Sequence, residues 1–298
     1  MGKLSAISWT DHTFSPWWGC AKIDPGCKHC YADTFADRVG QHVWGETAPR
    51  RFFGDKHWAE LVAWANAARK AGVRRKVFIA SMADVFELHA DPETRALQDA
   101  ARARLFALID SGVLDSLELQ LLTKRPENVA GMVPASWMVH GFPRNVWLGA
   151  SVCDNAGRDA RLPHLAELRH VVARVWVSYE PALEAVDFST ALADWGPGAL
   201  ADAVFNGGER RVTVPRLLDW IVVGAESGAK RRPFDVAWAQ ATADACAAAG
   251  VACWVKQDSA FKSGERGRIP DALWAVKQHP ASAMPPAIQP GLALGGAA

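Results

Sequence analysis

The repeated alternation of short apolar strands and helical segments limits the fold of this chain more than any other feature. Six runs rich in β-branched, aromatic or leucine residues are bounded by polar turns, and helical patterns lie between most of them. The runs cover residues 76–80, 117–123, 145–151, 174–180, 219–226 and 252–257. Repeated βα units of this kind predict an α/β protein with a parallel sheet.

The number of units favours a particular form of that sheet. A strand is also expected just before Cys20, which raises the count to seven. Six or seven parallel βα units indicate a partial TIM barrel rather than a closed eight-stranded one. A doubly wound open sheet fits the same alternation and stays as the alternative. No G-x-G-x-x-G motif follows any strand, which counts against a dinucleotide-binding fold.

The remaining segments suggest one domain with a tail. Helices are expected over residues 31–43, 57–72 and 92–111, and residues 182–215 read as a long connection or small insertion. A chain of 298 residues is long enough for one large barrel or two domains. We assign residues 1–278 to a single barrel domain. Residues 279–298 lack charge and periodicity, which predicts a flexible tail.

Composition indicates an ordinary globular chain. Half of the residues are hydrophobic and the formal net charge is +1, so charge names no partner. The first residues, MGKLSAISWTDHTF, contain no apolar run of the length expected for a signal peptide, and no segment reaches the roughly 20 apolar residues that a membrane helix needs. We therefore expect a cytoplasmic protein without membrane contact. Cys153, Cys246 and Cys253 lie in or beside apolar segments, which fits buried free thiols in a reducing compartment.

Three further cysteines are close together in the stretch WWGCAKIDPGCKHCY. Six residues separate Cys20 from Cys27, and two separate Cys27 from Cys30. Thiolates bind soft metals, and the turn at Pro25-Gly26 lets the three sulfurs approach one another. A structural zinc site normally has four protein ligands, whereas a reactive cluster keeps one position open. The spacing therefore predicts a metal site with room for another ligand.

This stretch resembles the cysteine loop of the radical S-adenosylmethionine (SAM) superfamily, which follows the first strand of a partial TIM barrel. The usual first gap in that family has three residues, and His29 stands where an aromatic residue is common. The resemblance implies that Cys20, Cys27 and Cys30 bind a 4Fe-4S cluster, whose fourth iron holds the amino and carboxylate groups of SAM.

Polar residues at the ends of the predicted strands form the rest of the candidate site, because the βα loops of a barrel converge there. Glu180 and Glu226 lie at the ends of apolar strands, where a buried carboxylate needs a partner, and SAM, Lys124, Arg125 or Lys256 could serve. Gly224 and Gly228 flank Glu226 and would let a ligand approach the backbone.

The elements SWTDHTFSPWWGC, S-x-EP, G-x-ESG and VKQ also resemble a phage-encoded three-cysteine branch of radical SAM-like proteins related to spore photoproduct lyase. In radical SAM proteins the end of the second strand helps to hold the SAM amino group, which points to residues 81–84. The candidate cofactor-binding residues are Ser81, Asp84, Lys124, Ser151, Glu180 and Gln257, with Met82 and Ala83 between the first two. The candidate catalytic residues are Glu180, Glu226 and Lys256.

The resemblance implies an isomerase or lyase that reductively cleaves SAM to a 5′-deoxyadenosyl radical. A flavodoxin- or ferredoxin-type protein would supply the electron. The branch and local basic clusters such as Lys230–Arg232 favour a modified pyrimidine in phage DNA, or a nucleotide, as substrate, and the host cytoplasm as location. Three alternatives stay open: a radical SAM enzyme for a peptide or small metabolite, a zinc protein that adds His29 or His12 to the cysteines, and a non-catalytic binding module.

Overall fold

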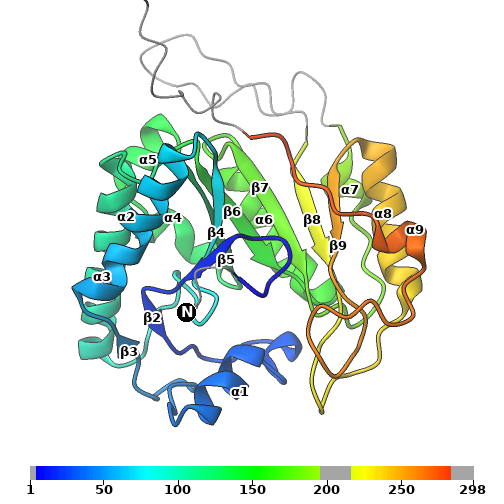
Figure 1. Cartoon of the computed structure of the whole chain (residues 1–298), viewed down its shortest axis with the longest axis horizontal. Helices are drawn as coiled ribbons and strands as arrows, with labels where there is room; N and C mark the ends of the chain where they lie inside the picture. The colour runs from blue at the N-terminus through cyan, green and yellow to red at the C-terminus, as the bar shows by residue number, and fades with distance from the viewer. Residues whose placement is uncertain (1–4, 195–215, 283–298) are drawn as a thin grey trace, which may run out of the picture.

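The computed structural model describes residues 5–194 and 216–282 (Figure 1). Within them, seven parallel strands form one curled sheet in the order β1-β4-β5-β6-β7-β8-β9. The strands are β1 (His12–Phe14), β4 (Arg75–Ile79), β5 (Leu117–Thr123), β6 (Val146–Ser151), β7 (Arg174–Tyr179), β8 (Trp220–Val223) and β9 (Ala252–Val255). Strands β1 and β9 are the two edges, so the sheet is a partial barrel rather than a closed one.

Helices follow most strands, and most of them cover the outer, convex face of the sheet, whereas α1 lies apart from that face, below the sheet in the view of Figure 1. The helices are α1 (Tyr31–Arg38), α2 (Asp55–Lys70), α3 (Pro92–Asp110), α4 (Val129–Met132), α5 (Ala135–His140), α6 (Asn155–Leu168), α7 (Ser189–Leu192), α8 (Val236–Ala249) and α9 (Asp271–Trp274). Two 3-10 helices, η1 (Pro25–Cys27) and η2 (Pro126–Asn128), and an antiparallel pair, β2 (Trp17–Trp18) with β3 (Arg51–Phe52), complete the described elements.

Alternating side chains of the strands point to opposite faces of the sheet and pack into two separate hydrophobic cores. Val77 and Ile79 of β4 belong to the large core that includes the apolar faces of the helices. Phe78, between them, points to the other face and joins a cluster rich in tryptophan. That second cluster contains Trp9, Trp147, Trp176, Trp220 and Val222. The inside of the partial barrel is therefore packed with the indole rings of four tryptophans.

A glycine makes room for this packing. A Cβ atom at Gly149 would lie 2.5 Å from ring atoms of Trp176 on the neighbouring strand. Only glycine fits that position, and the indole of Trp176 can then lie flat against β6 and reach Trp220, 5.2 Å away between ring centroids.

The predicted partial barrel and all six predicted strands are confirmed. The doubly wound alternative is wrong, because each strand pairs with the next one along the chain and the order never reverses. The first helix ends at Arg38 rather than near residue 43, since Gly40 takes a positive φ of 71° and turns the chain.

Two predicted segments lie largely outside the described residues. These are residues 195–215 of the expected long connection and residues 283–298 of the expected tail. Before that boundary, His279 packs against Trp220 and Trp254. Among the described residues, no helix has the length and apolar character needed to cross a membrane.

Candidate functional site

A cavity of about 290 Å³ lies at the carboxyl ends of the strands. One wall is the cysteine loop with the start of α1, and the opposite wall is formed by the segments that follow β7, β8 and β9. The structure brings all the predicted site residues to this cavity: Cys20, Cys27, Cys30, Ser81, Asp84, Lys124, Ser151, Glu180, Glu226, Lys256 and Gln257. Ala83 also lines it, whereas Met82 packs into a buried cluster with Trp18.

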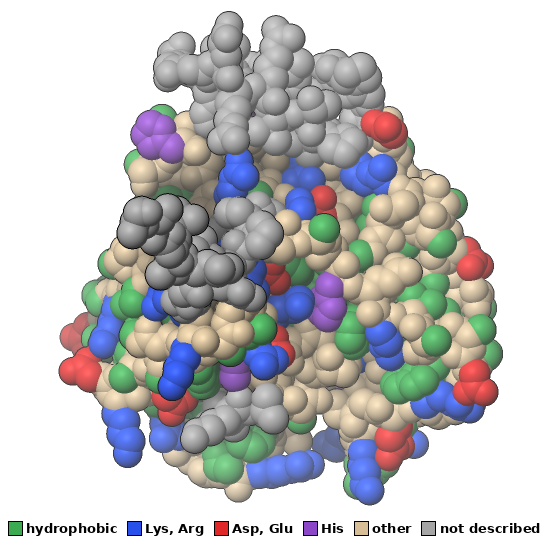
Figure 2. All heavy atoms as spheres, turned by 45° about the horizontal axis from the view of Figure 1, so that its top comes forward, with side chains coloured by type: hydrophobic (Ala, Val, Ile, Leu, Met, Phe, Trp, Pro, Cys, Tyr) green, Lys and Arg blue, Asp and Glu red, His purple; other side chains and the backbone are tan. Residues whose placement is uncertain are grey.

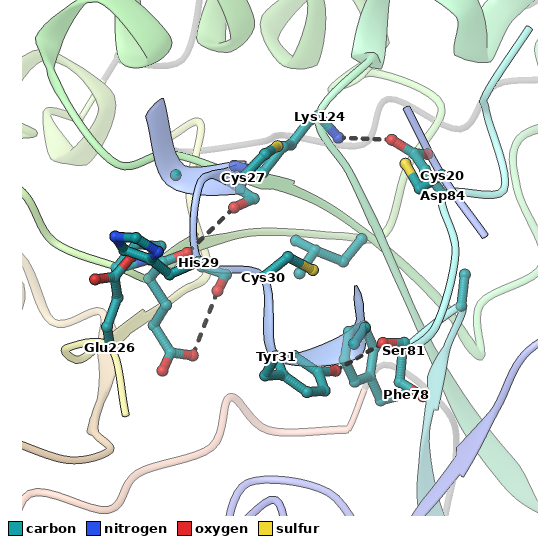
Figure 3. Close-up of a pocket in the computed structure, with 18 of the residues that line it drawn as sticks. Cys20, Cys27, His29, Cys30, Tyr31, Phe78, Ser81, Asp84, Lys124 and Glu226 are labelled. Atoms are coloured by element: carbon teal, nitrogen blue, oxygen red, sulfur yellow. Dashed lines mark hydrogen bonds between the residues drawn. The ribbon is translucent and has the colours of Figure 1, made fainter. Parts of the chain in front are cut away.

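The cysteine loop contains the turn that the sequence predicted. Pro25 begins the 3-10 helix η1, and the Asp24 carboxylate caps it by accepting a hydrogen bond from the backbone N–H of Cys27 at 3.1 Å. Cys30 lies directly before α1, and all three thiols face the same cavity (Figure 3). Among the described residues, no three Cys, His, Asp or Glu side chains already stand in positions to hold one metal ion.

Asp24 also ties this loop to the barrel. Its carboxylate lies 2.9 Å from Lys124 Nζ at the end of β5 and 2.6 Å from Arg161 Nη2 on α6. Burial alone would raise the pKa of Asp24, but the two cations and the η1 cap lower it to about 2. Arg161 further donates to the carbonyl of Ser151 at 3.0 Å. Lys124 therefore acts here as a partner of the cysteine loop.

Arg125 places a positive charge beside the first cysteine. Its Nη1 lies 3.6 Å from Cys20 Sγ and 2.9 Å from the Asp84 carboxylate, and its Nη2 donates to the Ala21 carbonyl at 2.9 Å. Asp84 also accepts from the Thr123 hydroxyl at 2.7 Å. Burial and the nearby carboxylates of Asp84 and Glu87 raise the pKa of the Cys20 thiol, while Arg125 opposes them. A guanidinium at this distance can offset negative charge on the sulfur.

A buried ion pair between Arg50 and Glu87 supports the backbone of the cysteine loop. Glu87 accepts a hydrogen bond from the Ala21 N–H at 2.7 Å and two from Arg50, at 2.8 and 2.9 Å. The side chains of Arg50 and Glu87 are 0% and 2% exposed. Burial tends to raise the pKa of Glu87, and the bonds from Arg50 overcome that effect and lower it. The pair fixes the backbone of the cysteine loop on the side away from the cavity.

The opposite wall carries a second ion pair. Lys256 Nζ lies 2.7 Å from Glu180 Oε1, which confirms one of the partners expected for a carboxylate at a strand end. A Cβ atom at Gly224 would lie 3.0 Å from that oxygen and 3.3 Å from Lys256 Cβ. Gly224 therefore makes room for this ion pair, whereas we had expected it to make room for a ligand.

Glu226 has a partner that the sequence did not identify. The Arg232 guanidinium and backbone N–H both donate to the carboxylate of Glu226. Burial favours the neutral acid, but the hydrogen bonds from Arg232 lower the pKa of Glu226 overall. The side-chain amide of Gln257 uses both its NH2 group and its oxygen in hydrogen bonds within the protein. It donates to Ala225 O and accepts from the Ser263 hydroxyl. Its side chain thus orders the wall of the cavity.

The aromatic residues that line the cavity, Trp9, Tyr31, Trp44 and Phe78, escaped the sequence analysis. Tyr31 donates its hydroxyl hydrogen to the Ser81 carbonyl at 2.7 Å (Figure 3), so it connects α1 to the end of β4. Trp9 contributes to the floor together with Phe78 and Leu122. His29 lines the cavity too, whereas His12 stacks on Trp64 of α2 and does not line it. The cavity therefore combines an apolar floor with a polar rim, as sites for flat ligands with charged groups do.

Comparisons with known proteins add a family assignment. The model of the family described as "Protein of unknown function (DUF5131)" matches residues 4–282. A solved structure of a spore photoproduct lyase mutant with bound AdoMet and dinucleoside spore photoproduct is similar at 15% identity and a TM-score of 0.42. The match covers 59% of this chain and 47% of that one, so it spans about half the length of the solved chain. None of the curated proteins compared with the chain matches it.

Proposed function

The chain belongs to the DUF5131 family, and we propose that it is a radical SAM enzyme that acts on a modified pyrimidine in DNA or in a nucleotide. The observation that supports this most is that three thiols of one loop and polar residues from six strand ends line the same cavity. In βα barrels that end of the sheet carries the chemistry.

The thiols suit a 4Fe-4S cluster by donor type and by position. Cys20, Cys27 and Cys30 supply three soft ligands from one loop, and the cavity leaves space beside them for a further ligand. The loop would have to bring the sulfurs closer together on loading, since they do not yet form a metal-holding group among the described residues. Such a cluster would supply the electron that cleaves SAM to methionine and a 5′-deoxyadenosyl radical.

The chain's own residues would bind SAM and exclude water. Glu180 and Lys256 present opposite charges 2.7 Å apart at the rim, which suits the amino and carboxylate groups of an amino acid. Ser81 and Ser151 add hydroxyl groups on neighbouring walls. The apolar floor of Trp9, Phe78 and Leu122 would shield a reactive carbon centre from water. Glu226, Lys256 and Glu180 are the candidates for proton transfer to the substrate.

The proposal also names partners. An electron must reach the cluster, and a flavodoxin- or ferredoxin-type protein of the cytoplasm is the class that we propose. We propose that the reaction on the substrate is an isomerisation or a lyase-type cleavage. A zinc protein is one rival, and of the two histidines considered for it only His29 lines the cavity.

The test is anaerobic reconstitution with iron and sulfide, followed by reaction with SAM and dithionite. We expect a brown protein with about four irons per chain and formation of 5′-deoxyadenosine. Cys20→Ala, Cys27→Ala and Cys30→Ala should each lose cluster iron and SAM cleavage. Cys246→Ala is the matched control, because Cys246 is fully buried in the large core and does not line the cavity.

Three results would contradict the proposal. A colourless protein with one zinc ion would identify the rival site. Full iron content and SAM cleavage in all three cysteine variants would overturn the ligand assignment. Label transfer from a deuterated peptide or metabolite into 5′-deoxyadenosine, with none from deuterated thymidine oligonucleotides, would replace the substrate class.

A further inference from the structure

The loops after β8 and β9 form one joined unit, which we call the β8/β9 lobe (residues 226–234 and 258–268). The N–H of Gly228 donates to Ala260 O at 3.0 Å, and the Ser259 hydroxyl donates to Arg232 O at 2.8 Å. Arg268 reaches back to Phe234 O at 2.8 Å. In Figure 1 these loops lie on the side of the barrel mouth opposite α1. The lobe is thus the wall of the cavity that faces the cysteine loop.

The β9 part of the lobe is anchored at its base. Asp258 is 1% exposed, and its carboxylate accepts hydrogen bonds from the Arg268 guanidinium and from the Arg268 N–H at 2.7 Å. Gln257 Oε1 accepts from Ser263 and from the N–H of Gly264 at 2.9 Å. These hydrogen bonds hold both ends of the segment of residues 258–268. The side chains of residues 260–264 are therefore held in place at the edge of the cavity.

An aromatic side chain is held outward at that edge. Phe261 is 67% exposed, the highest value of any large hydrophobic residue in the described part of the chain. Its neighbour Ala260 is buried, and Ser263, two residues further on, lines the cavity. An exposed phenyl ring costs solvation free energy, and nothing in the described chain covers it. Its position suits stacking against a flat group that lies just outside the cavity.

Exposed cations lie in the same lobe as this ring. Lys230, Arg231 and Lys262 are exposed and make no ion pair with any described residue, whereas Arg232 and Arg268 are paired within the lobe. Across the cavity, Lys28 of the cysteine loop is exposed as well. On the face shown in Figure 2, which brings the other end of the molecule forward, Lys and Arg side chains are interspersed with acidic ones rather than gathered into one field.

We propose that the β8/β9 lobe binds a single strand of DNA next to the nucleotide that enters the cavity. This inference rests on the proposed function and names the form of its substrate. Exposed aromatic rings flanked by Lys and Arg bind unpaired strands, because any base stacks on the ring and the cations neutralise phosphates. Phe261 provides the stacking surface, and Lys230, Arg231 and Lys262 provide the phosphate contacts.

The volume of the cavity and the exposed residues of the lobe favour a single strand over a duplex or a free nucleotide. About 290 Å³ is room for a small ligand and not for a base pair held in a helix. Lys230, Arg231 and Lys262 are exposed and do not line the cavity, so they are free to contact the phosphates that flank the inserted nucleotide. A free nucleotide has no flanking bases and would leave Phe261 without a partner.

The test is equilibrium binding of a fluorescent oligonucleotide of about ten nucleotides to the reconstituted protein, measured by anisotropy at several salt concentrations. The exposed residues Phe261→Ala and Lys230→Ala/Lys262→Ala are the lobe variants. We expect Phe261→Ala to weaken binding at least about fivefold. The double lysine variant should reduce the slope of log affinity against log salt by about 1.4.

The matched controls are exposed residues outside the lobe that do not line the cavity. Leu97→Ala removes another exposed apolar side chain, 54% exposed on α3, and Lys70→Ala/Arg144→Ala removes two exposed cations that form no ion pair among the described residues. Both controls should bind like the unaltered chain. Equal weakening by lobe and control variants, or tighter binding of duplex DNA, single-stranded RNA or an acidic peptide, would overturn the inference.

Formation of 5′-deoxyadenosine is measured in parallel without DNA. DNA binding that depends on the lobe, in a protein that does not cleave SAM, leaves the inference standing and removes the proposed function. SAM cleavage by a protein that does not bind DNA removes the inference and leaves the proposed function standing. The two failures are therefore distinguishable.

Discussion

Gly224 is the single residue on which the geometry of the cavity rim depends most directly. It sits after β8, and the space where its side chain would be is filled by Glu180 and Lys256. In Gly224→Ala, the new methyl group would push on a carboxylate oxygen 3.0 Å away and on the stem of Lys256. We expect a rate of SAM cleavage about 10- to 100-fold lower, because displacement of positioning groups by a fraction of an ångström is costly.

Gly131→Ala provides the control for this substitution. No atom lies within 4 Å of a Cβ placed on Gly131 in α4, so that variant should keep the unaltered rate. The measurement is the initial rate of 5′-deoxyadenosine formation at saturating SAM, with cluster iron determined for each sample. Equal rates in Gly224→Ala and the parent chain would show that the exact position of the Glu180–Lys256 pair does not affect cleavage of bound SAM.

At the residue scale, the sequence predicted which charged side chains reach the cavity and named Lys256 as a candidate partner of a strand-end glutamate. It did not identify Arg232 as the partner of Glu226 or Arg161 as a partner of Asp24. A strand pattern places Glu180, Glu226 and Lys256 at the mouth, because the carboxyl ends of parallel strands meet there. Their partners depend on side chains from distant elements. Arg161, which pairs with Asp24 across 137 residues, looks in the sequence like any arginine on a helix surface.

The segment between α1 and α2 illustrates how one buried side chain organises an irregular element. Arg50 donates to the carbonyls of Val43, Gly45 and Ala48 as well as to Glu87. It thus satisfies carbonyls that have no partner in a helix or strand. Because Glu87 in turn holds Ala21, this segment and the cysteine loop share one support.

Arg50→Leu should destabilise the fold strongly. It removes the nearer cation from the buried carboxylate of Glu87 and leaves only Arg125, 4.0 Å away. Removal of one partner from a buried ion pair costs about 3–5 kcal/mol. Arg51→Leu is the control, since Arg51 is exposed and lies over Trp18 at 5.0 Å, a contact that contributes about 0.5–1 kcal/mol. Denaturant titration gives both values. Similar losses in the two variants would contradict a central role for the Arg50–Glu87 pair.

At the element scale, regular patterns were predicted and irregular ones were not. The strands at residues 76–80 and 117–123 follow from alternation and apolar runs, and both are present as β4 and β5. The pair β2 and β3 has two residues on each side, too few for any periodicity to mark. The structure of residues 39–50 depends on Arg50 and Glu87, which are 37 residues apart.

The whole molecule is an open barrel whose interior is closed by segments from both ends of the described chain. Trp9 packs inside against Trp176 and Trp220, 5.4 and 5.8 Å away between ring centroids. His279 lies over Trp220 and Trp254, and its Nε2–H donates to the carbonyl of Trp9 at 3.0 Å. The two segments meet beside the edge strand β9. They take over part of the role that an eighth strand has in a closed barrel.

His279 makes this closure sensitive to pH. Burial lowers the pKa of His279 from its usual 6.5, and Lys76 adds to that effect, while the carbonyl of Trp9, Glu118 and Asp11 oppose it. The unfolded chain therefore takes up a proton at this site at a higher pH than the folded chain does. The contribution of neutral His279 is complete above pH 6.5 and is lost as the pH falls through the lower pKa of the folded state.

His279→Phe tests this closure, because phenylalanine keeps a ring between Trp220 and Trp254 but cannot take up a proton. The variant loses the hydrogen bond to Trp9, so its free energy of unfolding at about pH 8 should be about 1 kcal/mol lower. Between about pH 8 and about pH 5.5 it should then lose less stability than the parent chain, since one titrating group is gone. Denaturant titrations at each pH measure both effects. Other buried histidines such as His57, whose pKa is also lowered by burial, leave some slope in both proteins. Parallel curves for the two proteins would mean that His279 titrates alike in the folded and unfolded chains, and the two segments would then meet without a pH-dependent contact.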